Sequence, residues 1–202
     1  MPYPDRFYPV VDSISWVARL TKLGVGTIQL RAKNLNDADA LAIVREGLAV
    51  TRGTHSELVV NDYWRAAIEA QARHLHLGQE DLADADLAAI RKAGLSLGVS
   101  THDDDELATA LRAKPDYVAL GPIFFTTLKS MRFAPQGIPK ITEWKRRVGN
   151  LPLVAIGGIK FEHAADIFAA GADSIAVVSD VTQNADPDAR VRQWLGASAK
   201  AA

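Results

Sequence analysis

The sequence contains no cysteine, and its charges nearly cancel, with 23 Lys and Arg against 24 Asp and Glu. The missing thiols exclude a disulfide scaffold, a thiolate zinc site and a cysteine nucleophile. The small net charge excludes a general electrostatic attraction for nucleic acid or for an anionic membrane. Any anion site must therefore be local, and we expect neither nucleic acid nor a membrane as a partner.

Long hydrophobic runs and linkers rich in Pro, Gly and Ser are also missing from the chain. No apolar stretch approaches the length of a membrane span, and residues 1–6 have no signal-peptide character. We therefore expect a cytoplasmic protein. The 202 residues are 48% hydrophobic, which suffices for one sizeable core, so residues 1–202 are predicted to form a single domain.

Short runs rich in β-branched residues alternate along the chain with longer stretches in which apolar residues recur every three or four positions. This helical spacing is clear at Leu41, Val44 and Leu48, and again at Leu107 and Leu111. Strands that alternate with helices indicate parallel βαβ units rather than a meander or a sandwich. The predicted strands are residues 7–12, 27–31, 58–61, 74–77, 95–100, 117–121, 153–156 and 174–179.

About eight such units in about 200 residues reach the lower size limit of a closed barrel. An open, doubly wound sheet is the alternative. The barrel is favoured because no strand is followed by a Gly-x-Gly-x-x-Gly turn and because polar residues follow many strands instead of gathering at one point. Gly24, Gly94 and Gly171 each precede a predicted strand, where a left-handed glycine would end a helix. We predict an α/β fold that is a single (β/α)8 TIM barrel.

In a barrel of this kind, functional groups belong at the carboxyl ends of the strands. The second predicted strand leads into Gln29-Leu30-Arg31-Ala32-Lys33, where alternation places Gln29, Arg31 and Lys33 on one side. Two cations and an amide suit a phosphate-rich ligand. The alternative is that Arg31 and Lys33 are solvated residues that lead into the next helix.

Carboxylates follow the next two strands, at Asp62 and at Asp81. Mg²⁺ accepts one or two protein carboxylates together with substrate phosphates, so these aspartates near Arg31 and Lys33 would form a pocket for a metal diphosphate. The alternative is that each aspartate caps a helix. For Asp81 this alternative is strong, because Leu82 begins a helical stretch.

Hydroxyl groups and glycines follow the remaining strands. Ser100 ends the fifth strand as a ligand donor or a helix cap, whereas the acidic run 103–106 fits the first turn of a helix. The sixth strand enters the longest connection, which contains Thr126, Thr127 and Lys129 and is typical of a binding loop. These groups extend the prediction of an anion site.

A second phosphate site is indicated after the last two strands. Gly157 and Gly158 would let backbone N–H groups approach a phosphate, and Ser179 follows the eighth strand. The loops after strands seven and eight form a recurrent phosphate site in barrels. A simple tight turn would explain the glycines but not their coincidence with Ser179. His74 and His76 should face the same side of their strand, and they lack a third ligand for zinc.

Taken in order, these segments resemble the thiamine phosphate synthase family. Each segment alone is weak, but seven in sequence at predicted strand ends make a specific signature that covers nearly the whole chain. The matching segments are Gln29–Lys33, Asn61-Asp62, His76–Asp81, Ser100–His102, Asp116–Phe124, Ala155–Ile159 and Val177–Ser179.

The resemblance implies a transferase that couples 4-amino-5-hydroxymethyl-2-methylpyrimidine diphosphate with hydroxyethylthiazole phosphate, with Mg²⁺ as cofactor. The products are thiamine phosphate and diphosphate, and the family reaction is dissociative, with diphosphate leaving before the thiazole nitrogen captures the pyrimidine methyl cation. By the same resemblance, Asp62 and Asp81 hold Mg²⁺, and Lys129, Arg31 and Ser100 act in catalysis. The implied substrate-binding residues are Gln29, Arg31, Lys33, Asn61, Ser100, Thr126, Thr127, Leu128, Lys129, Gly157, Gly158, Val178 and Ser179.

The residues themselves agree with this chemistry. Departure of diphosphate needs charge neutralisation, which Mg²⁺, Arg31, Lys33 and Lys129 would supply. No nucleophilic side chain or strong base is required, consistent with the absence of Cys and of a recognisable Ser/His/Asp triad. The substrates are small molecules, and the sequence leaves open whether copies of the chain form a homo-oligomer.

The sequence departs from the family pattern at three positions. Ala32 replaces a usual Glu, Leu128 replaces a usual Thr and so removes a donor for the thiazole phosphate, and His74 stands where a small residue is usual. Two other functions stay open: a thiazole tautomerase-like barrel, which has less need of the carboxylates and cations, and a non-catalytic barrel that binds a phosphate ligand.

Overall fold

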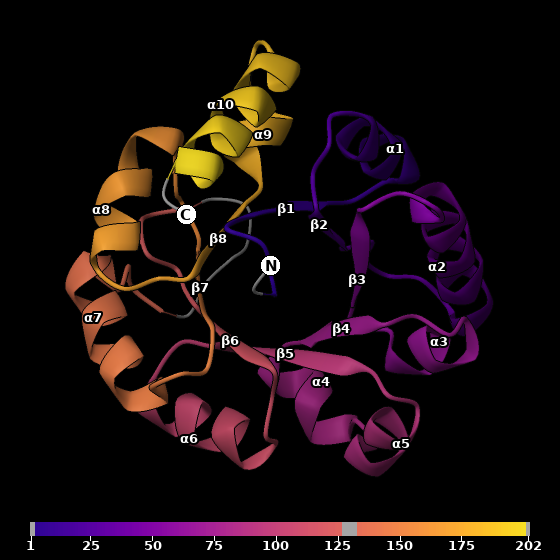
Figure 1. The fold of residues 1–202 in the computed structure, drawn as a ribbon. Coiled ribbons are helices and arrows are strands. Elements are labelled where there is room, and N and C mark those ends of the chain that lie inside the picture. The colour runs from indigo at the N-terminus through magenta and orange to yellow at the C-terminus, as the bar shows by residue number, and fades with distance from the viewer. Residues whose placement is uncertain (1–2, 127–132, 201–202) are drawn as a thin grey trace.

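In the computed structural model, which describes residues 3–126 and 133–200, eight parallel strands close into a barrel in sequence order. Figure 1 shows the strands around the centre and the helices as an outer ring. The predicted (β/α)8 TIM barrel is therefore confirmed. The strands are β1 (Phe7–Val11), β2 (Thr27–Leu30), β3 (Glu57–Asn61), β4 (His74–Leu77), β5 (Ser96–Thr101), β6 (Tyr117–Leu120), β7 (Leu153–Ile156) and β8 (Ser174–Val177).

The helices follow the strands along the chain. They are α1 (Ile14–Lys22), α2 (Asp37–Thr51), α3 (Trp64–Glu69), α4 (Gln79–Asp84), α5 (Leu87–Lys92), α6 (Asp104–Arg112), α7 (Gly137–Val148), η1 (Phe161–His163), α8 (Ala164–Ala169), α9 (Ser179–Thr182) and α10 (Pro187–Lys200). Within the described ranges, no helix is long and apolar enough to cross a membrane.

Pairing of the first strand with the last closes the barrel and excludes the open sheet. Phe7 on β1 lies opposite Ile175 on β8 in a parallel register. The Ile175 amide donates to the Arg6 carbonyl at 2.9 Å, and the Ser174 hydroxyl donates to the Asp5 carbonyl at 2.5 Å. Hydrogen bonds therefore continue across the seam, and no sheet edge is left open there.

Both faces of the strands are covered, which explains their almost continuous apolar sequences. Every residue of β1, β2, β6 and β8 is buried. One face packs against the helices, and the other fills the barrel interior. The interior cluster consists of Tyr8, Val10, Val59, Tyr117, Ala119, Val154 and Ala176.

The helix ends follow the local sequence. Asp103 caps α6 by accepting from the Glu106 amide at 2.9 Å, and the acidic run occupies the first turn as predicted. Gly24, Gly94 and Gly171 have φ values of +86°, +74° and +106°, which confirms their predicted left-handed conformation.

The amino end of the barrel accounts for the unusual His74. Its ring stacks on Tyr3 with centroids 4.1 Å apart, and its Nε2 lies 3.4 Å from Glu57 Oε2. These residues, together with Asp5 and Arg73, line a cavity of about 500 Å³. This cavity lies where the strands begin, at the end opposite to the predicted site. Both His74 and His76 face the barrel interior, as alternation predicts, since the first contacts Tyr3 and the second contacts Tyr117.

Candidate active site

The segment after β2 brings its predicted cations to the mouth of the barrel. Gln29 is buried inside the barrel, where its Nε2 donates to the Tyr8 hydroxyl at 2.7 Å. Arg31 is half-buried, and its positive charge contributes to lowering the pKa of His76. Lys33 is exposed and forms an ion pair with Asp62. Gln29 therefore contacts β1, Lys33 pairs with the residue that follows β3, and the charge of Arg31 reaches His76 on β4, which a purely solvated segment would not do.

Asp62 and Asp81 lie together, although they follow different strands. Their carboxyl groups are close enough for the negative charge of Asp62 to raise the pKa of Asp81. Asp62 has φ +64°, a left-handed conformation that is uncommon outside glycine. Such strain at a carboxylate is typical of a side chain that must point in one direction.

The helix-cap interpretations of both aspartates are wrong. The N-cap of α3 is Tyr63, and the N-cap of α4 is Gly78, so Asp62 lies outside its helix and Asp81 within the first turn of its own. Leu82 is the fourth residue of α4 rather than its beginning. From the first turn of α4, the Asp81 carboxyl group stays close to its own backbone and also lies near Asp62.

The pKa values of the two aspartates shift in opposite directions. Burial by itself raises the pKa of Asp62, but the hydrogen bond and the positive charge of Lys33 outweigh burial and hold that pKa below its ordinary value. For Asp81, burial and then the charge and hydrogen bond of Asp62 raise the pKa. Two adjacent carboxyl groups cannot both ionise easily, so this site favours a nearby cation.

The fit of Mg²⁺ to this site depends on its donor set. Within residues 3–126 and 133–200, no group of three or more His, Asp or Glu side chains is arranged to hold a metal ion. Mg²⁺ does not need such a cage, because it keeps several waters and is commonly bound by one or two carboxylates plus substrate phosphates. The Asp62–Asp81 pair offers two carboxylates with mutual repulsion that a cation would relieve. The donors present therefore fit Mg²⁺ held jointly with a phosphate ligand.

Asn61 adds a hydrogen-bond donor beside the carboxylates. The residue is buried at the end of β3 and lies opposite His76 in the sheet register. Its Nδ2 is near the Asp62 carboxyl group and helps to lower that pKa, yet it makes no hydrogen bond of good geometry within the described chain. A buried donor of this kind is usually satisfied by a ligand or water.

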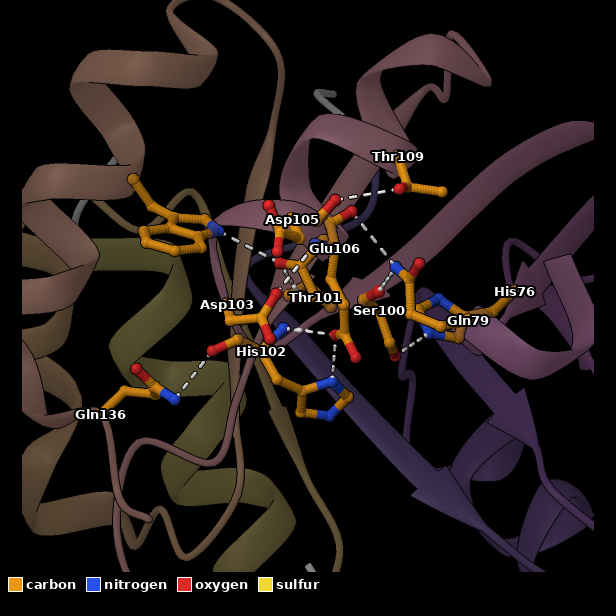
Figure 2. Close-up of polar contacts among 12 residues, drawn as sticks. His76, Gln79, Ser100, Thr101, His102, Asp103, Asp105, Glu106, Thr109 and Gln136 are labelled. Atoms are coloured by element: carbon orange, nitrogen blue, oxygen red, sulfur yellow. Dashed lines mark hydrogen bonds and ion pairs between the residues drawn. The ribbon is translucent and has the colours of Figure 1, made fainter. Parts of the chain in front are cut away.

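Ser100 sits at the end of β5 in a network of polar contacts, which Figure 2 shows. Its Oγ lies 2.8 Å from His76 Nε2, and its carbonyl accepts from Gln79 Nε2 at 2.6 Å. Because Asp103 caps the following helix, the cap interpretation of Ser100 is wrong. Its hydroxyl therefore faces the interior at the mouth, where a ligand donor was predicted.

His102 anchors the loops around β5. Its Nδ1 lies 2.6 Å from Glu106 Oε2, and its ring stacks on Phe133 with centroids 4.7 Å apart. Gln136 Nε2 donates to the His102 carbonyl at 2.8 Å, a contact visible in Figure 2. These contacts tie α6 to the segment that enters α7, beside the mouth.

The glycine pair after β7 is held by protein backbone. Gly157 and Gly158 have φ values of +98° and +66°, and a Cβ on Gly158 would lie 2.4 Å from the Phe125 carbonyl oxygen. The close approach of the loop after β6 thus requires glycine there, so the pair does not by itself indicate a phosphate. Val178 and Ser179 follow β8 directly, with Ser179 as the first residue of the short α9.

Thr126 is the last residue that the structure describes before residues 127–132. Thr127, Leu128 and Lys129 lie outside the described residues, so their predicted roles stay predictions from the sequence.

Sequence reasoning missed two tyrosines that face the site from below. The Tyr8 and Tyr117 hydroxyls are 2.8 Å apart, and Tyr117 also bonds His76 Nδ1 at 2.9 Å. A signal was present, since each tyrosine stands in a strand that is otherwise apolar. Burial lowers the pKa of His76 to about 4, so its imidazole is neutral near pH 7.

The sequence of this chain matches a known protein family. The family model described as thiamine monophosphate synthase matches residues 7–181. This chain belongs to the thiamine monophosphate synthase family. Within the family, the thiamine-phosphate synthase of Rhizobium etli is 55% identical over 96% of this chain and 96% of its own length. That of Klebsiella pneumoniae is 49% identical over 96% and 92%.

Solved structures agree with the family assignment. A thiamine phosphate pyrophosphorylase from Pyrococcus furiosus superposes with a TM-score of 0.84 at 25% identity, covering 96% of each chain. A 3-hexulose-6-phosphate synthase superposes with a TM-score of 0.70 at 15% identity, which shows a shared fold alone. The expected family, and with it the expected activity of a thiamine-phosphate synthase, a transferase of thiamine biosynthesis, are therefore confirmed.

Proposed function

We propose that this chain joins a pyrimidine diphosphate to a thiazole phosphate at the carboxyl end of its barrel, with Mg²⁺ as cofactor. One observation carries the proposal: the paired carboxyl groups of Asp62 and Asp81 lie beside the Lys33 ammonium. A thiazole tautomerase would have no use for a diphosphate-binding arrangement of this kind. Mixed carboxylates and cations at one mouth instead suit a metal-bound, multiply charged ligand.

Asp62 and Asp81 are the residues that would hold Mg²⁺. When bound, the ion would neutralise negative charge on the diphosphate oxygens. Lys33, which pairs with Asp62 in the ligand-free protein, would be released toward a phosphate oxygen. Arg31 would add a guanidinium, and the unpaired Asn61 Nδ2 would add a neutral donor.

In the proposed reaction, the bond between the pyrimidine methylene carbon and the diphosphate oxygen breaks, and its electron pair leaves with diphosphate. The lone pair of the thiazole nitrogen then forms the new carbon–nitrogen bond. The product is a thiazolium, so no proton has to be removed at the reacting atoms. The protein's part is to orient the substrates and to stabilise the departing charge.

Neutral polar groups would position the pyrimidine. Gln29 donates its Nε2 to Tyr8 and so keeps its Oε1 as an acceptor for a ligand donor. His76 is neutral and therefore adds no positive charge near a developing carbocation. Ser100 presents a hydroxyl at the same mouth. Sequence reasoning assigns Lys129 to the leaving group, and Thr126, Thr127, Leu128, Val178 and Ser179 to the thiazole phosphate.

Purified protein incubated with both substrates and Mg²⁺ tests the proposal. We expect thiamine phosphate and diphosphate in equal amounts, and no product when the metal is chelated. Two results favour the alternatives instead. Isomerisation of a thiazole carboxylate phosphate without the diphosphate substrate would indicate a tautomerase, and tight ligand binding without turnover would indicate a binding protein.

A further inference from the structure

An unbroken chain of hydrogen bonds crosses the barrel interior and ends at the mouth. Gln29 Nε2 donates to the Tyr8 hydroxyl at 2.7 Å, and the Tyr8 and Tyr117 hydroxyls are 2.8 Å apart. The Tyr117 hydroxyl is 2.9 Å from His76 Nδ1, and His76 Nε2 is 2.8 Å from Ser100 Oγ. The five residues come from β2, β1, β6, β4 and β5, so the chain depends on the closed barrel.

Four of these residues are buried, so each of their polar hydrogens needs an acceptor within the protein. Gln29, Tyr8, Tyr117 and His76 are at most 6% exposed, and only Ser100 is half-buried. A buried hydroxyl without an acceptor costs about 1–3 kcal/mol. The hydrogens must therefore all point the same way along the chain, except where the chain reaches a ligand or water.

The histidine can donate from only one of its two nitrogens. Burial lowers the pKa of His76 to about 4, so the neutral ring has one N–H and one bare nitrogen near pH 7. If Nδ1 accepts from Tyr117, then Nε2 must carry the hydrogen and donate to Ser100. If Nδ1 carries the hydrogen, then Ser100 must donate to Nε2.

Gln29 selects between these two directions. Because its Nε2 donates to Tyr8, the Tyr8 hydrogen must go to Tyr117, the Tyr117 hydrogen to His76 Nδ1, and the Nε2 hydrogen to Ser100. In the reverse direction the Tyr8 hydrogen would have no acceptor among the described residues. The first direction leaves the Ser100 hydroxyl hydrogen unused by the protein.

We propose that Tyr8, Tyr117 and His76 are positioning residues, which form a one-way relay from Gln29 and keep the Ser100 hydroxyl hydrogen free to donate to an anionic substrate oxygen. The identity of that substrate rests on the proposed function, but the direction of the relay does not. A hydroxyl held as a donor stabilises negative charge, whereas one that donates to histidine would present only lone pairs and repel it.

The fold makes room for this relay at Gly98. A Cβ on this β5 residue would lie 2.0 Å from Tyr117 Cζ and 2.4 Å from its hydroxyl oxygen. Because Gly98 stands directly opposite Tyr117 in the register, only glycine lets the ring lie across β5 toward His76. The glycine thus has a defined purpose in the barrel interior.

The direction of the relay can be measured without any substrate. Nitrogen NMR of protein labelled at histidine distinguishes the protonated nitrogen from the bare one, and the His76→Gln variant identifies the His76 signals. We expect the hydrogen of His76 on Nε2 in the wild-type protein. In Tyr117→Phe, which removes the donor to Nδ1, we expect the two signals to move toward each other as the tautomers mix.

Kinetics then test whether the relay acts through Ser100. Tyr117→Phe should lower kcat about ten-fold, the effect of losing one well-placed hydrogen bond, with little change in the KM for the thiazole substrate. In a Ser100→Ala background the same change should lower kcat by no more than about two-fold, because the group it positions is gone. Tyr3→Phe is the matched control, since it removes a tyrosine hydroxyl that takes no part in the relay although its ring packs against Tyr117, and it should leave kcat unchanged.

Each outcome decides the proposal. A hydrogen on Nδ1 of wild-type His76 overturns the relay whether or not the protein turns over substrate. Equal losses from Tyr117→Phe in both backgrounds overturn the action through Ser100. If Tyr117→Phe does not fold, Tyr8→Phe replaces it: Tyr117 keeps its bond to His76 there, so the hydrogen should stay on Nε2, and a move to Nδ1 would overturn the relay. Absence of turnover in the wild type overturns the proposed function, and the NMR result still decides the relay.

Discussion

At the scale of single residues, the carboxyl pair at the mouth is arranged for binding rather than for stability. Burial and the neighbouring Asp62 raise the pKa of Asp81, so its charged form is disfavoured in the folded protein. A group whose folded pKa is raised in this way destabilises the native state wherever it is ionised. Active sites commonly carry such unfavourable charge, which a ligand then compensates.

Replacing Asp81 by Asn should therefore not reduce the stability of the ligand-free protein. We expect the midpoint of thermal unfolding near pH 7 to stay the same or to rise, because the repulsion with Asp62 is removed. In the presence of Mg²⁺ and diphosphate, the wild type should gain more stability than the variant. Differential scanning fluorimetry with and without both ligands measures this, and a clear drop in the midpoint of the ligand-free variant would contradict it.

His76 makes a specific contribution to acid sensitivity. Its pKa is about 4 in the folded protein, against about 6.5 for a free histidine, so the unfolded chain binds a proton that the native state excludes. Stability is fully present above about pH 6.5 and is lost as the pH falls toward about 4, by up to about 3 kcal/mol. The free energy of unfolding in urea, measured across this range, should fall less steeply in His76→Gln. Identical slopes in the wild type and in His76→Gln would refute the assignment.

Sequence reasoning found the charged groups of the site but not the neutral groups beneath them. The charged residues Lys33, Asp62 and Asp81 follow strand ends. Because a barrel brings its strand ends together, the sequence could predict that these side chains lie close to one another. Tyr8 and Tyr117 are 109 positions apart and meet across the interior. Their contact depends on the strand register and on the space left by Gly98, which no local pattern reports.

At the scale of elements, strands were predicted to within one or two residues because parallel strands in a barrel are buried on both faces. The differences lie mostly at the carboxyl ends, where Asp12, Arg31, Gly121 and Ser179 leave the ladder for the mouth. Leu111 is 37% exposed although its spacing predicts an inward face. Hydrophobic periodicity locates a helix more reliably than it orients each residue.

The turn after β7 offers a test of close backbone packing. A side chain at Gly158 would meet two carbonyl oxygens of the neighbouring loop, whereas Gly53, with φ +76°, has nothing within 4 Å. Both Gly→Ala substitutions share the cost of a left-handed alanine, about 1–2 kcal/mol. Gly158→Ala should therefore cost about 2 kcal/mol more than Gly53→Ala in urea unfolding, because the clash forces the backbone to move. Equal costs would show that the loop yields easily.

At the scale of the whole molecule, the functional site and the contacts that stabilise the barrel lie at opposite ends of the strands. The charged site lies where the strands end, and Tyr3 stacks on His74 where they begin. In barrels of this type, catalysis belongs to the first end and stability to the second. The family match over residues 7–181 spans both ends.

Two neighbouring tyrosines, of which only Tyr117 is bonded through His76 to the mouth, test this separation by identical substitutions. The Tyr3 hydroxyl is buried without a hydrogen-bond partner in the described chain, whereas the Tyr117 hydroxyl has two. Tyr3→Phe should leave the free energy of unfolding unchanged or raise it, and Tyr117→Phe should lower it by about 1–3 kcal/mol. Only the second variant should lose activity. Urea unfolding and steady-state rates give both readouts, and loss of activity in Tyr3→Phe would contradict the separation.

The most direct measurement of the central claim is the Mg²⁺-dependent rate of thiamine phosphate formation in three Asp→Asn variants. Asp62→Asn and Asp81→Asn should each reduce kcat/KM by about 100-fold or more while the protein stays folded. Asp84→Asn, at an exposed aspartate on the same helix as Asp81, is the matched control and should keep the wild-type rate. Wild-type rates in both Asp62→Asn and Asp81→Asn would show that the carboxyl pair does not serve the reaction.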